Sequence, residues 1–511
     1  MPEEEWSRDP AALLGLAASF RTPGASNPYA AEPYLDAADE LLAAEASDPA
    51  LRVLAPVVRS VPLRELGRFT RARDLLASAA EELSTARLPF AVRIELKALI
   101  LLYDGVCATL SGRLDEGRGI LLRALHVAGP RTSPELRAEA SGCLALIDLR
   151  AGSLRSAETF IENARAAGVE SQARGLSTAP LRLASIAMAI EHGGVDGFEK
   201  RLAALIAETV GTEYQPLALA ELAALRGADD DEVAEILQEL QLITKEWEQP
   251  NLPDMMHDDA RIALLVRRQE AVAARAEIAR ITADPRHIQC PATWSARLAL
   301  DAGEPANAIE LLAPCLEMGD GHAPRTGTLA LLVAACAHDM VGDRTTADTL
   351  FERALVLAAP VGSVRPFGVL PRAHLSALHN RSTGRHHPES VQVLLDAVIA
   401  RFPNGEDGPP HTLSPRERIV LTRLAAGDTH LSGRAQEGLL AHQGDVRSSV
   451  RRWTAGRRAL ATRLNYDRNA GPSRAGSPMR SGMDGALDER EAQAWAFGVA
   501  EAAFARFEAD L

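Results

Sequence analysis

Two arginines near the C-terminal end of the sequence have a spacing that suits contact with a polyanion. In the stretch GDVRSSVRRW, residues 444–453, Arg447 and Arg451 fall one helical turn apart and share a face with Ser448. A guanidinium can donate two parallel hydrogen bonds to the edge of a guanine base, and it also pairs with phosphate. The stretch therefore predicts a helix that lies in a DNA groove, although Asp445 at its start opposes phosphate.

The charge of the surrounding segment favours this prediction. Residues 411–470 hold eleven arginines, no lysine and five acidic residues, a net charge of +6. The whole chain of 511 residues carries −14, so the remainder carries −20. A chain this acidic does not coat nucleic acid along its length, because phosphate binding needs concentrated positive charge. A compact basic unit on an acidic body is instead typical of a local nucleic-acid-binding module.

The elements expected around this stretch have the layout of a helix-turn-helix. The segment LSPRERIVLTRLAAG opens with Ser414 as N-cap, Pro415 at the first helical position and Glu417 three residues after the cap. A second short helix is expected at about residues 433–441, ahead of the arginine-bearing helix. Such an order, with the basic helix last, matches DNA-binding helix-turn-helix domains.

Both segments resemble a known family. LSPRERIVLTRLAAG is similar to the opening of LuxR-type helix-turn-helix domains, and GDVRSSVRRW is similar to their recognition segment. The resemblance implies that Arg447, Ser448 and Arg451 contact base edges of double-stranded DNA, from a homodimer on paired half-sites. It also implies that Arg452 contacts phosphate. Asp445 stands where the family has a threonine, so an arginine-rich helix that no longer binds DNA is the alternative.

A repeat with one internal spacing organises residues 60–360. In each unit a glycine is followed five, nine and twelve residues later by a small or apolar residue. The last three positions lie on one face of a helix, which predicts a helix, a glycine turn and a second helix per unit. A plain bundle of alanine-rich helices is the alternative. The five clear units are Gly67, Ala72, Leu76, Ala79; Gly112, Gly117, Leu121, Ala124; Gly152, Ala157, Ile161, Ala164; Gly303, Ala308, Leu312, Cys315; and Gly342, Ala347, Phe351, Ala354.

This pattern resembles the tetratricopeptide repeat. Poorer matches begin at Gly193, Gly227 and Gln269, and together the units predict about eight helical pairs. We expect an all-α protein with a tetratricopeptide-like solenoid over residues 1–380. A repeat followed by the C-terminal domain is similar to the rear part of the large ATP-binding LuxR-type regulators. No lysine follows a glycine here, as a phosphate-binding loop requires, so no ATPase domain is expected.

The remaining boundaries follow from composition. Residues 381–411 are expected to hold one amphipathic helix and a Pro/Gly linker, and residues 412–470 the helix-turn-helix unit. Residues 471–486 are expected to form a flexible linker, and residues 487–511 a last amphipathic helix. That helix either packs on its own chain or contacts a partner.

Other sequence patterns argue against several classes of protein. The five cysteines include no CxxC pair, so we expect buried reduced thiols, with no metal site and no cofactor. Common catalytic motifs are absent from the sequence. The clusters MMHDD (residues 255–259) and RHHPE (residues 385–389) are explained by solvated loops or helix starts, so no enzyme is expected.

The sequence also bears on where the protein is found. The acidic stretch MPEEEWSRDP is unlike a signal peptide. The longest apolar run, residues 329–337, is far below the ~20 residues that cross a membrane, so we expect a cytoplasmic protein.

Two functions from different classes follow. The first is a LuxR-like transcriptional regulator, in which the repeat binds a protein or small-molecule effector and the basic unit binds DNA. The second is a protein-interaction scaffold with a relic helix-turn-helix. A fragment of a longer regulator is a third, weaker expectation.

Overall fold

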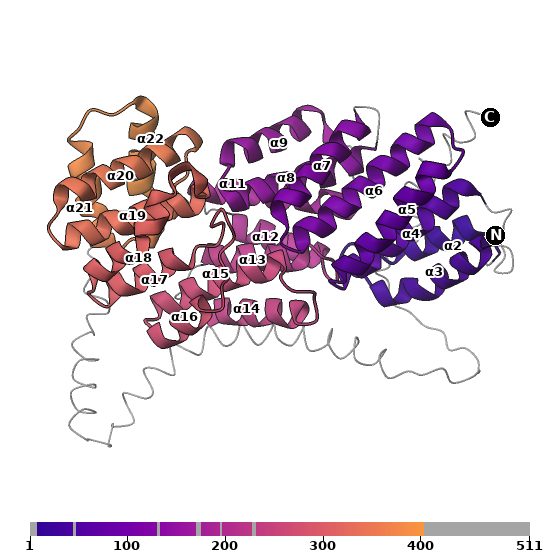
Figure 1. Cartoon of the computed structure of the whole chain (residues 1–511), viewed down its shortest axis with the longest axis horizontal. Coiled ribbons are helices and arrows are strands. Elements are labelled where there is room, and N and C mark those ends of the chain that lie inside the picture. The colour runs from indigo at the N-terminus through magenta and orange to yellow at the C-terminus, as the bar shows by residue number, and fades with distance from the viewer. Residues whose placement is uncertain are drawn as a thin grey trace, which may run out of the picture. The chain divides into compact units, whose positions relative to one another are not determined.

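The structure is a computed structural model that describes residues 8–43, 48–129, 133–169, 175–194, 197–226 and 231–402 (Figure 1). The predicted helix-turn-helix unit, with Arg447, Ser448, Arg451 and Arg452, lies outside the described residues, as does the expected helix at 487–511. Within the described ranges there are helices, turns and loops but no strand. The all-α prediction is confirmed for this part of the chain.

The N-terminal helices form hairpins in which each helix packs against the next one along the chain. Several of them begin with proline in the first turn behind an aspartate, asparagine or serine that accepts a hydrogen bond from a backbone N–H of that turn. These helices are α2 (Pro10–Ser19), α3 (Pro28–Leu42), α4 (Pro49–Glu65), α5 (Phe69–Thr85), α6 (Phe90–Leu110), α7 (Leu114–Ala128), α8 (Pro134–Ala151), α9 (Leu154–Ala166), the 3-10 helix η1 (Gly175–Thr178) and α11 (Ala179–Glu191).

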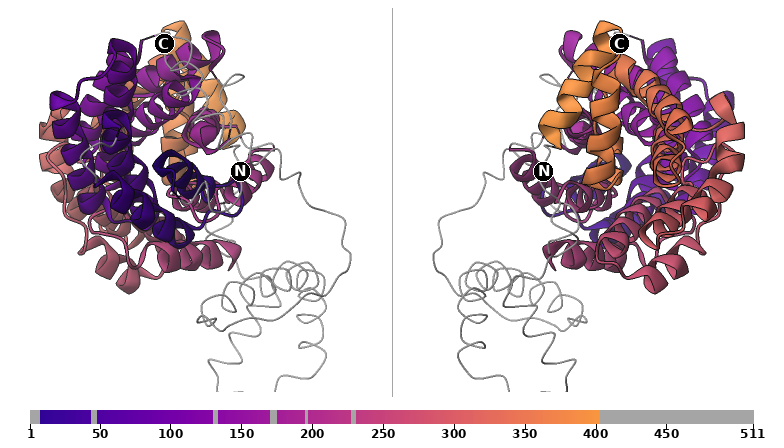
Figure 2. Two further views of the ribbon diagram at one scale, coloured as in Figure 1. Left: turned by 90° about the vertical axis from the view of Figure 1, so that its right-hand side faces the viewer. Right: turned by 90° about the vertical axis from the view of Figure 1, so that its left-hand side faces the viewer.

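The same nearest-neighbour packing continues to residue 402. The remaining elements are α12 (Phe198–Glu208), α13 (Gln215–Arg226), α14 (Asp231–Thr244), α15 (Leu252–Arg267), α16 (Ala271–Ile278), α17 (Pro291–Asp301), α18 (Pro305–Glu317), η2 (Gly319–Gly321), α19 (Pro324–Met340), α20 (Arg344–Ala358), η3 (Ala359–Val361), η4 (Arg365–Val369), α21 (Arg372–Thr383) and α22 (Glu389–Arg401). Among the described residues up to 402 the helices wind around a common axis (Figure 2), and the winding brings α15 against α6 and α19 against α8. Stacked hairpins of this kind fit an α-solenoid.

The repeat seen in the sequence has the structural role that its spacing predicts. In all five clear units a helix ends, a glycine adopts the left-handed conformation with φ between 69° and 85°, and a second helix begins. The residues five, nine and twelve positions after the glycine are buried in every one of these units. Their small side chains let the paired helix approach closely, and the larger side chain fills the space between the helices.

The weaker units are partly confirmed. Gly193 adopts a φ of 87° ahead of α12, and Gln269 adopts a φ of 59° between α15 and α16. Gln269 therefore occupies a turn that elsewhere in the repeat is made by glycine. Gly227 lies outside the described residues.

The interior contains two large apolar clusters. The first spans α4 to α15 and also includes Ile288 and Ala323. The second runs from Cys290 to Phe402. The segment around residues 287–323 therefore lies where the two cores meet. None of the helices in the described ranges has both the length and the hydropathy needed to cross a membrane.

Candidate metal centre

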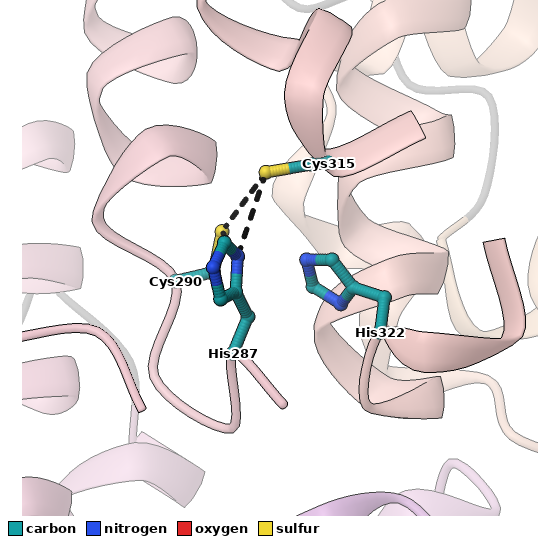
Figure 3. Close-up of side chains that lie close together, drawn as sticks. All are labelled: His287, Cys290, Cys315 and His322. Atoms are coloured by element: carbon teal, nitrogen blue, oxygen red, sulfur yellow. Dashed lines mark hydrogen bonds between the residues drawn. The ribbon is translucent and has the colours of Figure 1, made fainter. Parts of the chain in front are cut away.

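Two histidines and two cysteines from separate elements converge between α16 and α19 (Figure 3). The four residues, which we call the Cys₂His₂ cluster, are His287 in the loop before α17, Cys290 at the start of α17, Cys315 in α18 and His322 just before α19. One donor atom of each lies within 4.8 Å of the other three. In the part of the chain that the structure describes, this is the one compact group of three or more potential metal ligands.

The loop that carries His287 is shaped by Asp284. The Asp284 carboxylate accepts hydrogen bonds from the backbone N–H groups of Arg286 and Gln289 at 2.9 and 3.2 Å. Its carbonyl accepts from the His287 N–H at 3.0 Å. This turn holds His287 at a φ of 53°, a left-handed conformation that costs a non-glycine residue about 1–2 kcal/mol. Strain of this kind is concentrated at binding sites, where the surrounding packing fixes a side chain in place.

Helices place the two thiols. Cys290 is the N-cap residue of α17, so its sulfur lies beside the positive end of that helix, which favours a thiolate. Cys315 occupies the last position of its repeat unit. That position turns the side chain into the interior, and Cys315 is only 4% exposed. The four other clear units have alanine there: Ala79, Ala124, Ala164 and Ala354.

His322 has one ring nitrogen in use and one buried without a partner. Its Nδ1 lies 3.2 Å from the carbonyl oxygen of Ala323 and 3.3 Å from Oγ1 of Thr326. Because the Thr326 hydroxyl donates to the His287 carbonyl at 2.5 Å, the His322 Nδ1–H donates to these oxygens. In the neutral ring Nε2 then carries the lone pair, and among the described residues no group makes a hydrogen bond of normal geometry to it, although the Cys290 sulfur interacts with the ring. Metal-binding histidines usually show this arrangement, with the second nitrogen donating to a carbonyl.

The three distances among Cys290, Cys315 and His287 fit the edges of a tetrahedral ion site. The sulfurs of Cys290 and Cys315 are 3.5 Å apart, and each lies 3.8 Å from Nδ1 of His287. With Zn–S bonds of about 2.3 Å and Zn–N bonds of about 2.0 Å, a tetrahedron has S···S edges of about 3.8 Å and S···N edges of about 3.5 Å. The observed separations differ from these edges by about 0.3 Å or less. Figure 3 shows the His322 ring on the remaining side, turned toward His287.

Mutual contact and burial change the pKa values in the cluster. The hydrogen bond between the two thiols lowers the pKa of Cys290 and raises the pKa of Cys315. Burial opposes the charged form of His322, but the Cys290 sulfur and the Ala323 carbonyl outweigh it and raise the pKa of the imidazole. When only protons are bound, Cys290 is therefore the more acidic of the two thiols, and His322 holds its proton more firmly than a free imidazole does. A divalent cation would displace these protons and bind two thiolates and two neutral rings.

This ligand set suits structural binding of a soft or borderline cation. Structural zinc sites fill all four tetrahedral positions with cysteine and histidine, whereas catalytic sites leave one position for water or substrate. Four protein donors already surround the centre of the cluster. The arrangement can therefore hold α17, α18 and the start of α19 together, and it offers no position at which water would be activated.

The polar clusters singled out from the sequence have other surroundings. MMHDD lies within the first turns of α15, where Asp259 pairs with Arg150 at 2.5 Å. In RHHPE, His387 lies 3.3 Å from the Glu352 carboxylate and also contacts Ser382. Both clusters thus have structural partners in neighbouring helices.

The sequence did not predict the Cys₂His₂ cluster, because its two cysteines do not form a CxxC pair. The wide spacing of the five cysteines along the sequence also argued against a shared site. Two signals were present in the sequence: HIQC at residues 287–290 and CLEMGDGH at residues 315–322 each pair one cysteine with one histidine. A third signal is the cysteine at a repeat position that is otherwise alanine.

No protein-family model matches the sequence, and no curated protein matches it either. The resemblance to LuxR-type domains and to tetratricopeptide repeats therefore depends on the quoted residues alone. The chemistry of the Cys₂His₂ cluster follows from its own geometry.

Proposed function

We propose that this protein binds one Zn²⁺ ion in the Cys₂His₂ cluster and that the ion stabilises the α-solenoid between α16 and α19. The observation that carries the proposal is the set of four donor atoms within 4.8 Å of one another. The unpaired, buried Nε2 of His322 adds to it, because an unsatisfied buried polar atom costs about 1–3 kcal/mol. A metal bond would remove that cost, and two thiolates would neutralise the charge of the ion.

The donor types favour zinc over other cations. Calcium and magnesium take oxygen ligands, and the cluster provides sulfur and nitrogen. A tetrahedral set of two sulfurs and two nitrogens is typical of zinc, and its redox-inert ion suits a structural role.

Metal analysis of the purified full-length chain tests this proposal. We expect one zinc per chain after dialysis, and a Co²⁺-substituted protein with the d–d absorption of a tetrahedral ion. His322→Ala should lose the metal, whereas His192→Ala, at an exposed histidine outside the cluster, should keep it. Zinc retained equally by both variants would show that the metal binds elsewhere.

A second function is proposed for the C-terminal part, and its charge of +6 and its LuxR-like segments favour it. Here the chain is a cytoplasmic transcriptional regulator that binds double-stranded DNA as a homodimer. Arg447, Ser448 and Arg451 would contact base edges, and Arg452 would contact phosphate. The tetratricopeptide-like solenoid would bind a protein or small-molecule effector.

Retention on DNA at increasing salt concentration tests the second function. Arg447→Ala/Arg451→Ala should elute at lower salt than the wild type, because two base-edge contacts and two positive charges are lost. The matched control is Arg68→Ala/Arg71→Ala, which removes the same charge from exposed positions around α5. Equally weak retention of all three proteins at low salt would contradict DNA binding. Recovery of one stoichiometric partner protein without DNA would instead support the interaction scaffold with a relic helix-turn-helix.

A further inference from the structure

We propose that Gln289 and Arg286 are positioning residues of the metal centre and that they couple zinc binding to two distant helices, α15 and α7. This inference rests on the proposed zinc binding. Neither side chain is a ligand, but each is the chain neighbour of one: Arg286 precedes His287, and Gln289 precedes Cys290. Fixing a ligand therefore also fixes the residue that reaches the distant helix.

Gln289 provides the stronger of the two links. It is 6% exposed, and its Nε2 donates to the carbonyl oxygen of Met255, in the first turn of α15, at 2.7 Å. The same carbonyl lies 3.4 Å from a guanidinium nitrogen of Arg150 in α8. One buried acceptor thus joins the ligand loop to α15 and to α8.

Arg286 provides a second link, through its backbone carbonyl and through its guanidinium group. Its carbonyl accepts a hydrogen bond from the Ala323 N–H at 2.7 Å, which fixes the backbone next to His322. Its guanidinium pairs with Asp115, in the first turn of α7, at 3.2 Å. The two side chains of this ion pair are 43% and 71% exposed, so it contributes less than the buried hydrogen bond of Gln289.

The apolar residues around the ligands are divided between the two hydrophobic cores. Ile288 and Ala323 pack in the core of the N-terminal helices, whereas Cys290 and Cys315 belong to the core of α17 to α22. The Cys₂His₂ cluster therefore lies at the seam between the two cores. An ion that holds its four ligands together also holds these two groups of apolar residues in one position.

The coupling follows from loop entropy. Residues 282–290 connect α16 and α17 outside any helix, so their position depends on the Asp284 turn, on the backbone hydrogen bond between Arg286 and Ala323, and on side-chain contacts. Zinc would restrict this loop, and the contacts of Gln289 and Arg286 would then form at a smaller entropic cost. Coupling between two sites is reciprocal, so losing the Gln289 contact must weaken zinc binding. We expect Gln289→Ala to lower the zinc affinity about fivefold, the factor that corresponds to one buried hydrogen bond of about 1 kcal/mol.

Hydrogen exchange of the full-length chain with and without zinc tests the coupling. Zinc should slow exchange in the ligand segments and also in the first turns of α15 and α7. Gln289→Ala should abolish the effect in α15, and Arg286→Ala should abolish it in α7. Thr282→Ala, at an exposed position of the same loop, is the matched control and should change neither effect.

The possible results separate this inference from the proposed function. Protection confined to residues 279–290 and 315–323 in a chain that binds one zinc would overturn the coupling but leave zinc binding intact. A chain that binds no zinc would overturn the proposed function itself. If Gln289→Ala does not fold, the wild-type exchange pattern and Arg286→Ala still decide the question, because each tests a distant helix directly.

Discussion

At the residue scale, protons and metal compete for the same atoms of the Cys₂His₂ cluster. The thiol–thiol hydrogen bond raises the pKa of Cys315, and the surroundings of His322 raise the pKa of its ring. Both groups therefore hold a proton more firmly than usual in the absence of metal. Zinc binding must release those protons, because its ligands are thiolates and neutral imidazoles.

Zinc affinity is therefore expected to fall as the pH is lowered from about 8 to about 6. The affinity falls at lower pH for two reasons. The raised pKa of His322 extends its protonation toward neutral pH, and Cys315 must lose a proton to bind zinc. Competition with a chelator of known affinity at several pH values measures the effect. An affinity that does not change with pH would mean that the ligands are not thiols and imidazoles.

The repeat itself supplies a test of Cys315. Cys315→Ala restores the residue found at this position in the four other clear units, so the metal-free protein should keep its fold. Zinc should raise the melting temperature of the wild type by mass action and should have no effect on this variant. Cys336→Ala, at a fully buried cysteine of α19 outside the cluster, should still respond to zinc. A zinc-dependent rise in Cys315→Ala would exclude this cysteine as a ligand.

At the element scale, the helical hairpins could be predicted because one local rule determines each of them. A turn that needs a left-handed residue selects glycine. The helix after it buries the residues five, nine and twelve positions after that glycine. Gln269 is an exception to this rule, since it adopts the same left-handed turn without being glycine. The family resemblance of the repeat stays a prediction.

The candidate site could not be predicted in the same way, because its ligands come from three elements. His287 and Cys290 are three residues apart, but Cys315 and His322 approach them only through the packing of α17, α18 and α19. Nothing in the local sequence fixes that distance. The unpaired nitrogen of His322 is likewise a property of the folded chain.

Two glycines of the repeat offer a matched comparison at this scale. Gly152 and Gly303 have φ values of 83° and 75°, so alanine is strained at both. A methyl group on Gly152 would lie 2.3 Å from the backbone nitrogen of Arg325 at the start of α19, whereas a methyl group on Gly303 would meet no atom within 4 Å. Gly152→Ala should therefore lower the melting temperature more than Gly303→Ala. Equal losses would contradict the close approach of α19 to the turn after α8.

At the scale of the whole molecule, buried charges join the N-terminal hairpin to helices far along the chain. Arg21, after α2, pairs with Glu65 at 2.8 Å and with Glu213, before α13, at 2.7 Å. Arg64 pairs with Glu213 at 2.7 Å and with Glu139 of α8 at 3.2 Å. Three carboxylates thus face two guanidinium groups. Burial raises the pKa of Glu65 to about 7.

This network predicts that stability falls as the pH rises through neutrality. The folded-state pKa of Glu65 is raised, so its contribution is complete below the ordinary pKa of about 4.3 and is lost as the pH passes about 7. Burial also opposes the charge of Glu213, but Arg21 and Arg64 outweigh it and lower the pKa of Glu213, whose contribution therefore changes only at acidic pH, below this window.

Urea unfolding at about pH 5 and about pH 8 measures the effect of Glu65. The free energy of unfolding of the wild type should be smaller at the higher pH, and Glu65→Gln should show less of this decrease. Glu310→Gln, at an exposed position of α18, serves as the control and should behave as the wild type does. The same pH dependence in Glu65→Gln and in the wild type would show that Glu65 is ionised throughout this range.

X-ray absorption at the zinc edge of the full-length protein is the most direct test of the proposed metal centre. Binding in the Cys₂His₂ cluster predicts a first shell of two sulfur atoms at about 2.3 Å and two nitrogen atoms at about 2.0 Å. A first shell made only of oxygen and nitrogen, or a purified chain that holds no zinc, would contradict it.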